Sequence, residues 1–149
     1  MTRERKVEKI LEIARSLIGA PYKYGAYLEV YADNQTAFDC SSFLQYVFKQ
    51  ISINIPRSTI LQAAADGKEI IYPEIVMPGD VIFFEGKQGH YRHDLFPADR
   101  KIYIGHAALS VGSSRIIHAT NNSTASGVIE QSVITLPESY NVTIVKRFF

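Results

Sequence analysis

Apolar residues near the N-terminus recur at the spacing of a helix. They are Val7, Ile10, Leu11, Ala14, Leu17 and Ile18, and charged residues fill the other side of the same segment. This i, i+3, i+4, i+7 pattern predicts an amphipathic helix. Gly19 suits a left-handed cap just past the helix, and Pro21 prevents the helix from continuing.

A second apolar stripe begins at Cys40, after an aromatic, turn-rich segment that reads as an irregular connection. Its members are Phe43, Leu44, Val47, Phe48 and Ile51. The spacing predicts a helix buried against a sheet, with Asp39 or Ser41 as its N-cap. The following segment NIPRSTILQAAADG predicts a short helix that ends at Gly67. We expect the inward side chains of this short helix to be Ile60, Leu61, Ala64 and Ala65.

The second half of the chain has the patterns of strands. VIFFE, residues 81–85, is a short apolar run bounded by turn residues, which predicts a core strand. Residues 101–112 and 115–120 predict a β-hairpin, and residues 141–149 predict a last strand at a sheet edge, where Lys and Arg discourage pairing with other chains. Because helices precede antiparallel strands, we expect an α+β fold in one domain, residues 1–149. The polar segment 85–101 is expected to be an exposed excursion.

Composition and charge exclude several classes of protein. A chain of 149 residues with 46% apolar residues can bury the core of one domain. Its net charge of +1 provides no strong field for a phosphate backbone or an anionic membrane, so we expect neither a nucleic-acid partner nor membrane insertion. A single cysteine excludes an internal disulfide and a Cys-rich zinc framework. Nothing in these totals indicates the oligomeric state.

The N-terminal segment resembles neither a secretory signal nor a transit peptide. Glu4, Glu8 and Glu12 interrupt it, and it never reaches a continuous apolar core. As written, the chain is expected in the cytoplasm. Export by another route, or with a leader that this sequence lacks, remains an alternative, so the localisation stays open.

The only cysteine, Cys40, has two interpretations. A lone cysteine is more often a small buried hydrophobe than a nucleophile. However, a position in the first turn of a helix favours a thiolate, because the unpaired N–H groups and the positive end of the helix dipole stabilise negative charge. The same N–H groups suit an oxyanion hole. On the second interpretation we expect Cys40 to have a lowered pKa and to react with electrophiles near neutral pH.

A nucleophilic cysteine needs a base, and two histidines interrupt the predicted hairpin. A turn made of Gly112 to Ser114, or any odd-length turn in the same register, puts Ala108 opposite His118. His106 and His118 then become diagonal neighbours on one face, within reach of each other. A two-residue turn would put them on opposite faces. In the favourable register we expect Cys40 as nucleophile, His106 as general base and His118 as the residue that orients the base.

The other two histidines lie in the polar excursion. His90 and His93, with Asp94 and Asp99 nearby, form an H-x-x-H pair without a convincing third ligand. Solvated loop residues explain this pattern better than a metal site does. We therefore expect neither a metal nor a cofactor.

Several segments, taken in order, resemble the NlpC-type cell-wall peptidase family. They are FDCSSFLQYVF, the NIPRSTILQAA stretch, PGDVIFF, GHAALSVG and RIIHA. The resemblance runs from about Ala20 through Thr120. It implies a papain-like α+β fold in which a helix that carries the cysteine packs on an antiparallel sheet that carries the histidine. It also implies hydrolysis of peptide bonds in peptidoglycan stem peptides, commonly the bond after γ-D-glutamyl, through a thioester acyl-enzyme.

The resemblance also assigns residues. Cys40 matches the nucleophile, His106 the base and His118 the third catalytic residue. Tyr22 matches a tyrosine that assists at the oxyanion hole, and Asp39 and Ser41 match positions that help bind the amino end of the stem peptide.

Several features of the chain depart from the family pattern. Ala26 stands where the family has the second glycine after the aromatic segment, and the excursion 85–101 is longer than usual. Ser42 stands where the family signature Asp-Cys-Ser-Gly has glycine, which implies added bulk near the cleft. His106 follows an extended IYIG run, residues 102–105, instead of opening its strand.

Other functions fit the same sequence. A papain-like amidase or acyltransferase that acts on another amide or on a lipid would need the same nucleophile and base. A module that binds stem peptides without cleaving them is the alternative from a different class. The sequence alone does not identify the stem peptide.

Overall fold

The computed structural model describes residues 1–26, 37–73, 75–86, 95–96 and 102–149. Its strands form one antiparallel sheet of six strands in the order β1-β6-β2-β3-β4-β5. The strands are β1 Lys68–Ile70, β2 Val81–Glu85, β3 His106–Gly112, β4 Arg115–Asn121, β5 Ser126–Ser132 and β6 Asn141–Arg147. Helices precede nearly all of the sheet along the chain, so the predicted α+β class is confirmed.

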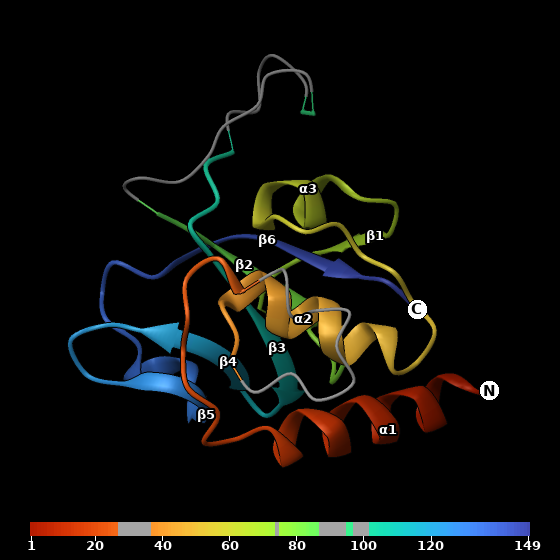
Figure 1. Ribbon diagram of the computed structural model, residues 1–149. Coiled ribbons are helices and arrows are strands. Elements are labelled where there is room, and N and C mark those ends of the chain that lie inside the picture. The colour runs from red at the N-terminus through yellow and green to blue at the C-terminus, as the bar shows by residue number, and fades with distance from the viewer. Residues whose placement is uncertain (27–36, 74, 87–94, 97–101) are drawn as a thin grey trace.

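The helices are α1 Arg3–Ser16, α2 Cys40–Lys49 and α3 Thr59–Ala64, with a turn of 3-10 helix, η2, at Val133–Thr135. Figure 1 shows α2 lying across the sheet and α1 running beneath it. The large core lies between these helices and the sheet, and it joins Phe43, Leu44 and Val47 of α2 to Ala107 and Leu109 of β3. In the described residues no helix is long and apolar enough to cross a membrane.

The helical predictions are mostly confirmed. α1 ends at Ser16, and Gly19 adopts the left-handed conformation at φ 98°. The buried face of α2 contains the predicted apolar stripe, and Asp39 is its N-cap. The inward face predicted for the short helix is confirmed in part: Ile60 is buried, and Leu61 and Ala64 are partly buried against the core. The prediction missed Gln62 and Ala63, which are also buried. The buried amide of Gln62 is stabilised by hydrogen bonds to the carbonyls of Ser41 and Pro56.

Three strand predictions need correction. β6 is not an edge strand, because β1 pairs with it on the side away from β2. The edges are β1 and β5, and neither strand was predicted. Residues 102–105 do not belong to the hairpin strand, so His106 opens β3 instead of following an extended run within it. The expected excursion 85–101 lies largely outside the described residues.

The β3–β4 hairpin reaches the favourable register by a different turn from the one predicted. Only Ser113 and Ser114 form the turn, both in the left-handed conformation at φ 53° and 57°, and Gly112 pairs with Arg115. A two-residue turn alone would put the histidines on opposite faces. A bulge between Ser110 and Gly112 adds one residue, so Leu109 pairs with Ile117 and, in that register, Ala108 lies opposite His118. The predicted register is confirmed, and the predicted three-residue turn is wrong.

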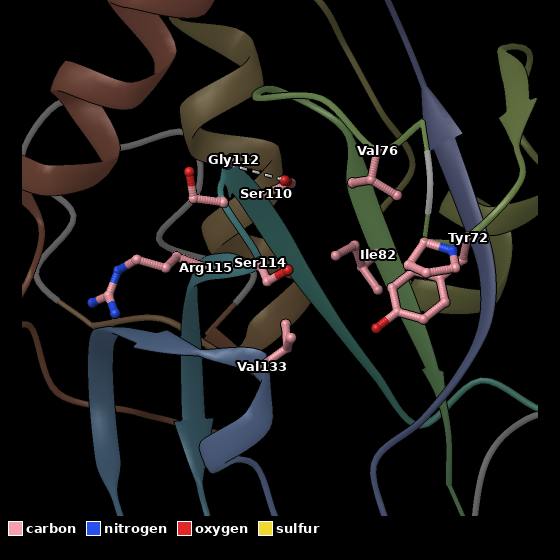
Figure 2. A pocket seen from close by; sticks show the side chains of 10 residues that line it. Tyr72, Val76, Ile82, Ser110, Gly112, Ser114, Arg115 and Val133 are labelled. Atoms are coloured by element: carbon pink, nitrogen blue, oxygen red, sulfur yellow. Dashed lines mark hydrogen bonds between the residues drawn. The ribbon is translucent and has the colours of Figure 1, made fainter.

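The sheet face away from the helices carries a smaller apolar cluster that includes Ile82, Ala108, Ile116 and Val145. A cavity of about 190 Å³ opens at the turn end of β3 and β4. Figure 2 shows Tyr72, Ile82, Ser114 and Arg115 among its lining residues, which include no cysteine or histidine.

A buried ion pair joins the start of β2 to the end of β6. The carboxylate of Asp80 is fully buried and accepts hydrogen bonds from the guanidinium of Arg147 at 2.7 and 2.8 Å. Its Oδ2 also accepts from the backbone N–H of Met77 at 2.8 Å. The contact raises the pKa of Arg147, since its hydrogen bond to the Asp80 carboxylate favours the charged guanidinium. The ion pair therefore holds the start of β2 against the end of β6.

Replacing Arg147 by Met is expected to lower the free energy of unfolding by about 3 kcal/mol, because it leaves the Asp80 carboxylate buried without its main partner. Arg115→Met is the matched control. Arg115 pairs with Glu130 at the surface, and its loss is expected to cost less than about 1 kcal/mol. Urea unfolding of the two variants measures both values. Equal losses would contradict the assigned role of the Asp80–Arg147 pair.

Candidate active site

The N-terminus of α2 is held by reciprocal hydrogen bonds. Asp39 Oδ1 accepts from the backbone N–H of Ser42 at 2.8 Å, and Ser42 Oγ accepts from the backbone N–H of Asp39 at 2.9 Å. Such a capping box stabilises a helix by about 1 kcal/mol and fixes its first turn, where Cys40 is the first residue. Ser42 is fully buried in this role. The expectation that its side chain adds bulk to the cleft is therefore wrong.

Cys40 lies against the first residues of β3. The backbone pairing of β3 with β4 starts at Leu109 and Ile117, so His106 to Ala108, at the beginning of β3, precede it. The backbone N–H groups of Ala107 and Ser41 act to lower the pKa of the Cys40 thiol, since they favour its thiolate. Ala107 directly follows His106 in the chain.

The two hairpin histidines contact each other. His106 Nε2 lies 2.7 Å from His118 Nδ1, as expected for diagonal neighbours on one face. His118 is fully buried, and its Nε2 lies 2.7 Å from Gln131 Oε1 on β5. The rings of Phe84 and Tyr140 pack against His106, with centroids 5.9 and 5.3 Å from its own. These contacts fix the plane of the His106 ring.

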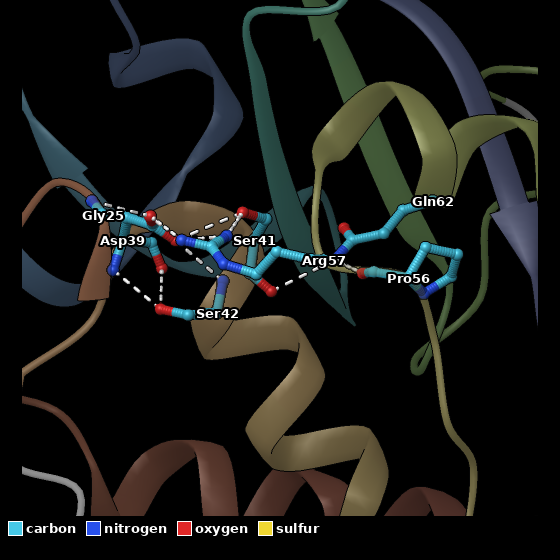
Figure 3. Close-up of polar contacts among 7 residues, drawn as sticks. All are labelled: Gly25, Asp39, Ser41, Ser42, Pro56, Arg57 and Gln62. Carbon is cyan, nitrogen blue, oxygen red and sulfur yellow. Dashed lines mark hydrogen bonds and ion pairs between the residues drawn. The ribbon is translucent and has the colours of Figure 1, made fainter. Parts of the chain in front are cut away.

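Polar side chains gather at the start of α2, as Figure 3 shows for Asp39, Ser41 and Arg57. Asp39 accepts hydrogen bonds from the Arg57 guanidinium at 2.6 and 3.3 Å and from the Gly25 backbone N–H at 3.2 Å. Ser41 Oγ lies 3.2 Å from Asp39 Oδ1 and also accepts from Arg57. Arg57 thus ties both predicted binding residues, Asp39 and Ser41, into one network.

Tyr22 is brought to the same place by a backbone bridge. Its segment pairs with Phe38, and the Lys23 N–H donates to the Phe38 carbonyl at 2.9 Å. Burial, followed by the proximity of Cys40 and of the Asp39 carboxylate, raises the pKa of Tyr22 to about 12. The Tyr22 hydroxyl therefore keeps its proton at neutral pH and remains a donor.

The expected lowered pKa of the cysteine is wrong for the free protein. Burial, followed by the Asp39 carboxylate, raises the pKa of the Cys40 thiol to about 12. The N–H groups of Ala107 and Ser41 and the charge of Arg57 act in the opposite direction but do not prevail. Asp39 itself stays ionised: burial opposes its charge, but the hydrogen bonds from Arg57 and Ser42 hold its pKa below the usual value.

Both histidines are neutral bases in the free protein. Burial, followed by the proximity of His118, lowers the pKa of His106 to about 3. Burial lowers the pKa of His118 to about 4, although its hydrogen bond to Gln131 acts in the opposite direction. At pH 7 the site therefore contains a thiol and two neutral imidazoles, so His106 is in the protonation state that a general base requires.

Two cavities meet at Gly105. One, of about 240 Å³, is lined by Tyr22, Tyr24, Asp39, Cys40, Thr59, Ile104 and Gly105. The other, of about 320 Å³, is lined by Phe84, Glu85, Gly86, Gly105, His106, Ser139 and Tyr140. A Cβ on Gly105 would lie 2.6 Å from the Cα of Gly86, so the backbone at this junction requires glycine. Cys40 thus lines one cavity and His106 lines the other.

Sequence reasoning missed Arg57, Gln131 and Tyr140. Arg57 directly follows Pro56 and precedes the N-cap Ser58, a position that signals a turn but not a contact with Asp39. Gln131 belongs to β5, which was not predicted. His90, His93, Asp94 and Asp99 lie outside the described residues, and the described part of the chain contains no cluster of His, Cys, Asp and Glu suited to a metal ion.

Comparison with curated proteins finds relatives that are longer than this chain. The γ-DL-glutamyl hydrolase of Bacillus subtilis is 32% identical over 114 residues, which are 76% of this chain and 23% of the relative. A probable endopeptidase of Corynebacterium glutamicum is 32% identical over 117 residues, 78% of this chain and 44% of the relative. The chain thus spans less than half the length of these relatives.

Comparison with solved structures supports the fold. The NlpC/p60 domain of the peptidoglycan hydrolase SagA superposes with a TM-score of 0.69 at 24% identity and covers 95% of this chain and 98% of that one. NlpC2 of Trichomonas vaginalis gives a TM-score of 0.72 at 21% identity over 96% of this chain and 46% of its own. The sequence profile of the NlpC/P60 family matches residues 19–140, so the chain belongs to the NlpC/P60 family.

Proposed function

We propose that residues 1–149 form a single catalytic domain, a cysteine endopeptidase that cleaves peptidoglycan stem peptides after γ-D-glutamyl. The observation that carries the proposal is the contact of 2.7 Å between His106 Nε2 and His118 Nδ1, with Cys40 and His106 lining two cavities that share Gly105. A nucleophile, a base and a group that orients the base are the three parts of a cysteine hydrolase site.

In the first step the Cys40 sulfur attacks the carbonyl carbon of the scissile amide while His106 accepts the thiol proton. The tetrahedral intermediate collapses to a thioester, and His106 returns the proton to the departing amine. A water molecule then attacks the thioester, His106 again accepts a proton, and the acid is released with the thiol restored.

Charge on the carbonyl oxygen is stabilised by donors at the start of α2 and by Tyr22. The raised pKa of Tyr22 keeps a proton on its hydroxyl, so the side chain can donate to an oxyanion. The Tyr22 hydroxyl already carries the proton that it donates in this hydrogen bond.

The Asp39 carboxylate is the acceptor for the ammonium group at the amino end of the stem peptide. Asp39 stays ionised, and Arg57 and Ser41 hold its orientation at the edge of the cavity that contains Cys40. The cavity beside His106 takes the residue on the amine side of the bond. The name of the Bacillus subtilis relative, a γ-DL-glutamyl hydrolase, supports γ-D-glutamyl as the acyl group.

The second candidate is a module that binds stem peptides without cleaving them. One observation favours it: the pKa of about 12 leaves almost no thiolate on Cys40 at neutral pH. In that case Asp39 and Arg57 would bind the peptide, and the histidines would only stabilise the fold.

Purified protein is expected to release dipeptides or tripeptides from digested peptidoglycan, as measured by mass spectrometry of the soluble products. Cys40→Ala is expected to lower the rate at least about a thousandfold, since no other group supplies the nucleophile. Thermal unfolding of the same variant controls for loss of fold. Unchanged release by Cys40→Ala would remove Cys40 as nucleophile. Binding of stem peptides by wild type without any release would favour the second candidate.

The rate at which iodoacetamide alkylates Cys40 is expected to distinguish two routes: reaction of the thiolate already present, and deprotonation of the thiol by His106. For a thiol with a pKa of about 12, the thiolate population rises about tenfold per pH unit between pH 7 and 11. His106 adds a second route by accepting the proton, so at pH 7 wild type should react at least about tenfold faster than His106→Gln. The two rates should converge near pH 11. Equal rates at pH 7 would contradict the role of His106 as base.

A further inference from the structure

We infer that Gln131 is a positioning residue that fixes the tautomers of both histidines and leaves the lone pair of His106 on Nδ1. This inference rests on the proposed function for its effect on catalysis, but the tautomers themselves exist without substrate. Gln131 lies on β5 and, within the described residues, its hydrogen bond to the site is the one with His118.

The three side chains form a diagonal row across three neighbouring strands. His118 on β4 lies between His106 on β3 and Gln131 on β5. His118 pairs directly with Ile129, so Gln131 is its diagonal neighbour on the same face, two residues along β5. The contacts of 2.7 Å on both sides of His118 follow from this placement.

The direction of each hydrogen bond is set by a backbone carbonyl at the far end of the row. Thr135 Oγ1 lies 2.6 Å from the Ser132 carbonyl oxygen, which can only accept, so the Thr135 hydroxyl proton points there. Gln131 Nε2 lies 2.8 Å from the same hydroxyl oxygen and must therefore be the donor. The amide oxygen Oε1 of Gln131 then faces His118.

The positions of the protons on the two imidazole rings follow from this orientation of the Gln131 amide. Gln131 Oε1 is an acceptor, so His118 carries its proton on Nε2. Neutral His118 then has a lone pair on Nδ1 and accepts a proton from His106 Nε2. Neutral His106 has one proton, on Nε2, so its Nδ1 is the basic nitrogen. The opposite orientation of the Gln131 amide would reverse every bond and put the proton of His106 on Nδ1, where it would prevent acceptance of the thiol proton.

Other groups near the pair do not set its tautomers. Phe84 and Tyr140 face His106 with their rings, and the Tyr140 hydroxyl lies 3.3 Å from Thr120 Oγ1 and accepts from Asn122 at 3.3 Å. The nearby charge, on Asp39, faces Arg57. Among the described residues, Gln131 is the group whose hydrogen bond reaches the outer nitrogen of His118.

The test replaces Gln131 with Met or with Glu. Met has a similar length but lacks an acceptor oxygen, whereas Glu keeps one. Long-range proton–nitrogen NMR correlations of the imidazoles at pH 7, without substrate, report which nitrogen of each ring is protonated. Wild type and Gln131→Glu are expected to carry the proton on Nε2 of both rings. Gln131→Met is expected to show a mixture of tautomers on both rings.

The kinetic result is expected to follow the tautomers. Gln131→Met should lower kcat at least about tenfold with little change in KM, because a His106 proton on Nδ1 blocks the base. Gln131→Glu should recover kcat to within a few-fold of wild type. Thr135→Val, which removes the acceptor of the Gln131 amide, should give an intermediate loss, and Gln50→Met, a glutamine far from the site that contacts Tyr46, should give none.

Unchanged Nε2 tautomers in Gln131→Met, with unchanged kcat, would overturn the inference. The NMR arm also separates it from the proposed function. Mixed tautomers in a protein that cleaves no stem peptide would uphold the positioning role and reject the peptidase. Active wild type with His106 protonated on Nδ1 would reject the positioning role and leave the peptidase intact.

Discussion

The packing of α2 across the sheet is the interaction on which the site depends. Phe43, Leu44 and Val47 are fully buried against β3 and β4, and each such side chain contributes about 1.5 to 3 kcal/mol when removed from water. Ala107 and Ala119 supply small side chains where the helix meets these strands. Since the capping box fixes the first turn, the apolar contacts also fix the place of the Cys40 sulfur. A hydrophobic constraint thus sets the geometry of a polar site.

The sequence predicted the parts of this arrangement that repeat at a regular spacing. The stripe of α2 repeats at helical spacing, and the apolar runs of β2, β3 and β4 lie between turn residues. These patterns led to the α+β fold and to Cys40, His106 and His118 as one group. The register of the hairpin was predicted correctly with the wrong turn, because a bulge at Val111 offsets a two-residue turn and bulges have no periodic signal. Arg57 and Gln131 were missed since their contacts join segments that are distant in sequence.

The electrostatics of the site differ from the simplest expectation for a cysteine at a helix start. Burial and the Asp39 carboxylate outweigh the effect of the Ala107 and Ser41 N–H groups, so the thiol holds its proton. Asp39 also caps α2 and pairs with Arg57. The carboxylate that stabilises the start of the helix therefore disfavours a thiolate in the free protein. In the proposed mechanism, catalysis relies on a neutral base whose tautomer is set by the row from Gln131 to His106.

Detection of the acyl-enzyme tests the central claim, attack by Cys40 on the γ-D-glutamyl carbonyl, most directly. Wild-type protein is mixed with a stem peptide of defined sequence, quenched in acid within milliseconds to seconds, digested and analysed by mass spectrometry. The account predicts an adduct with the mass of the acyl fragment ending in γ-D-glutamyl, on the peptide that contains Cys40, which forms before the acid product appears. Product release without any adduct on that peptide, or an adduct on another residue, would contradict the account.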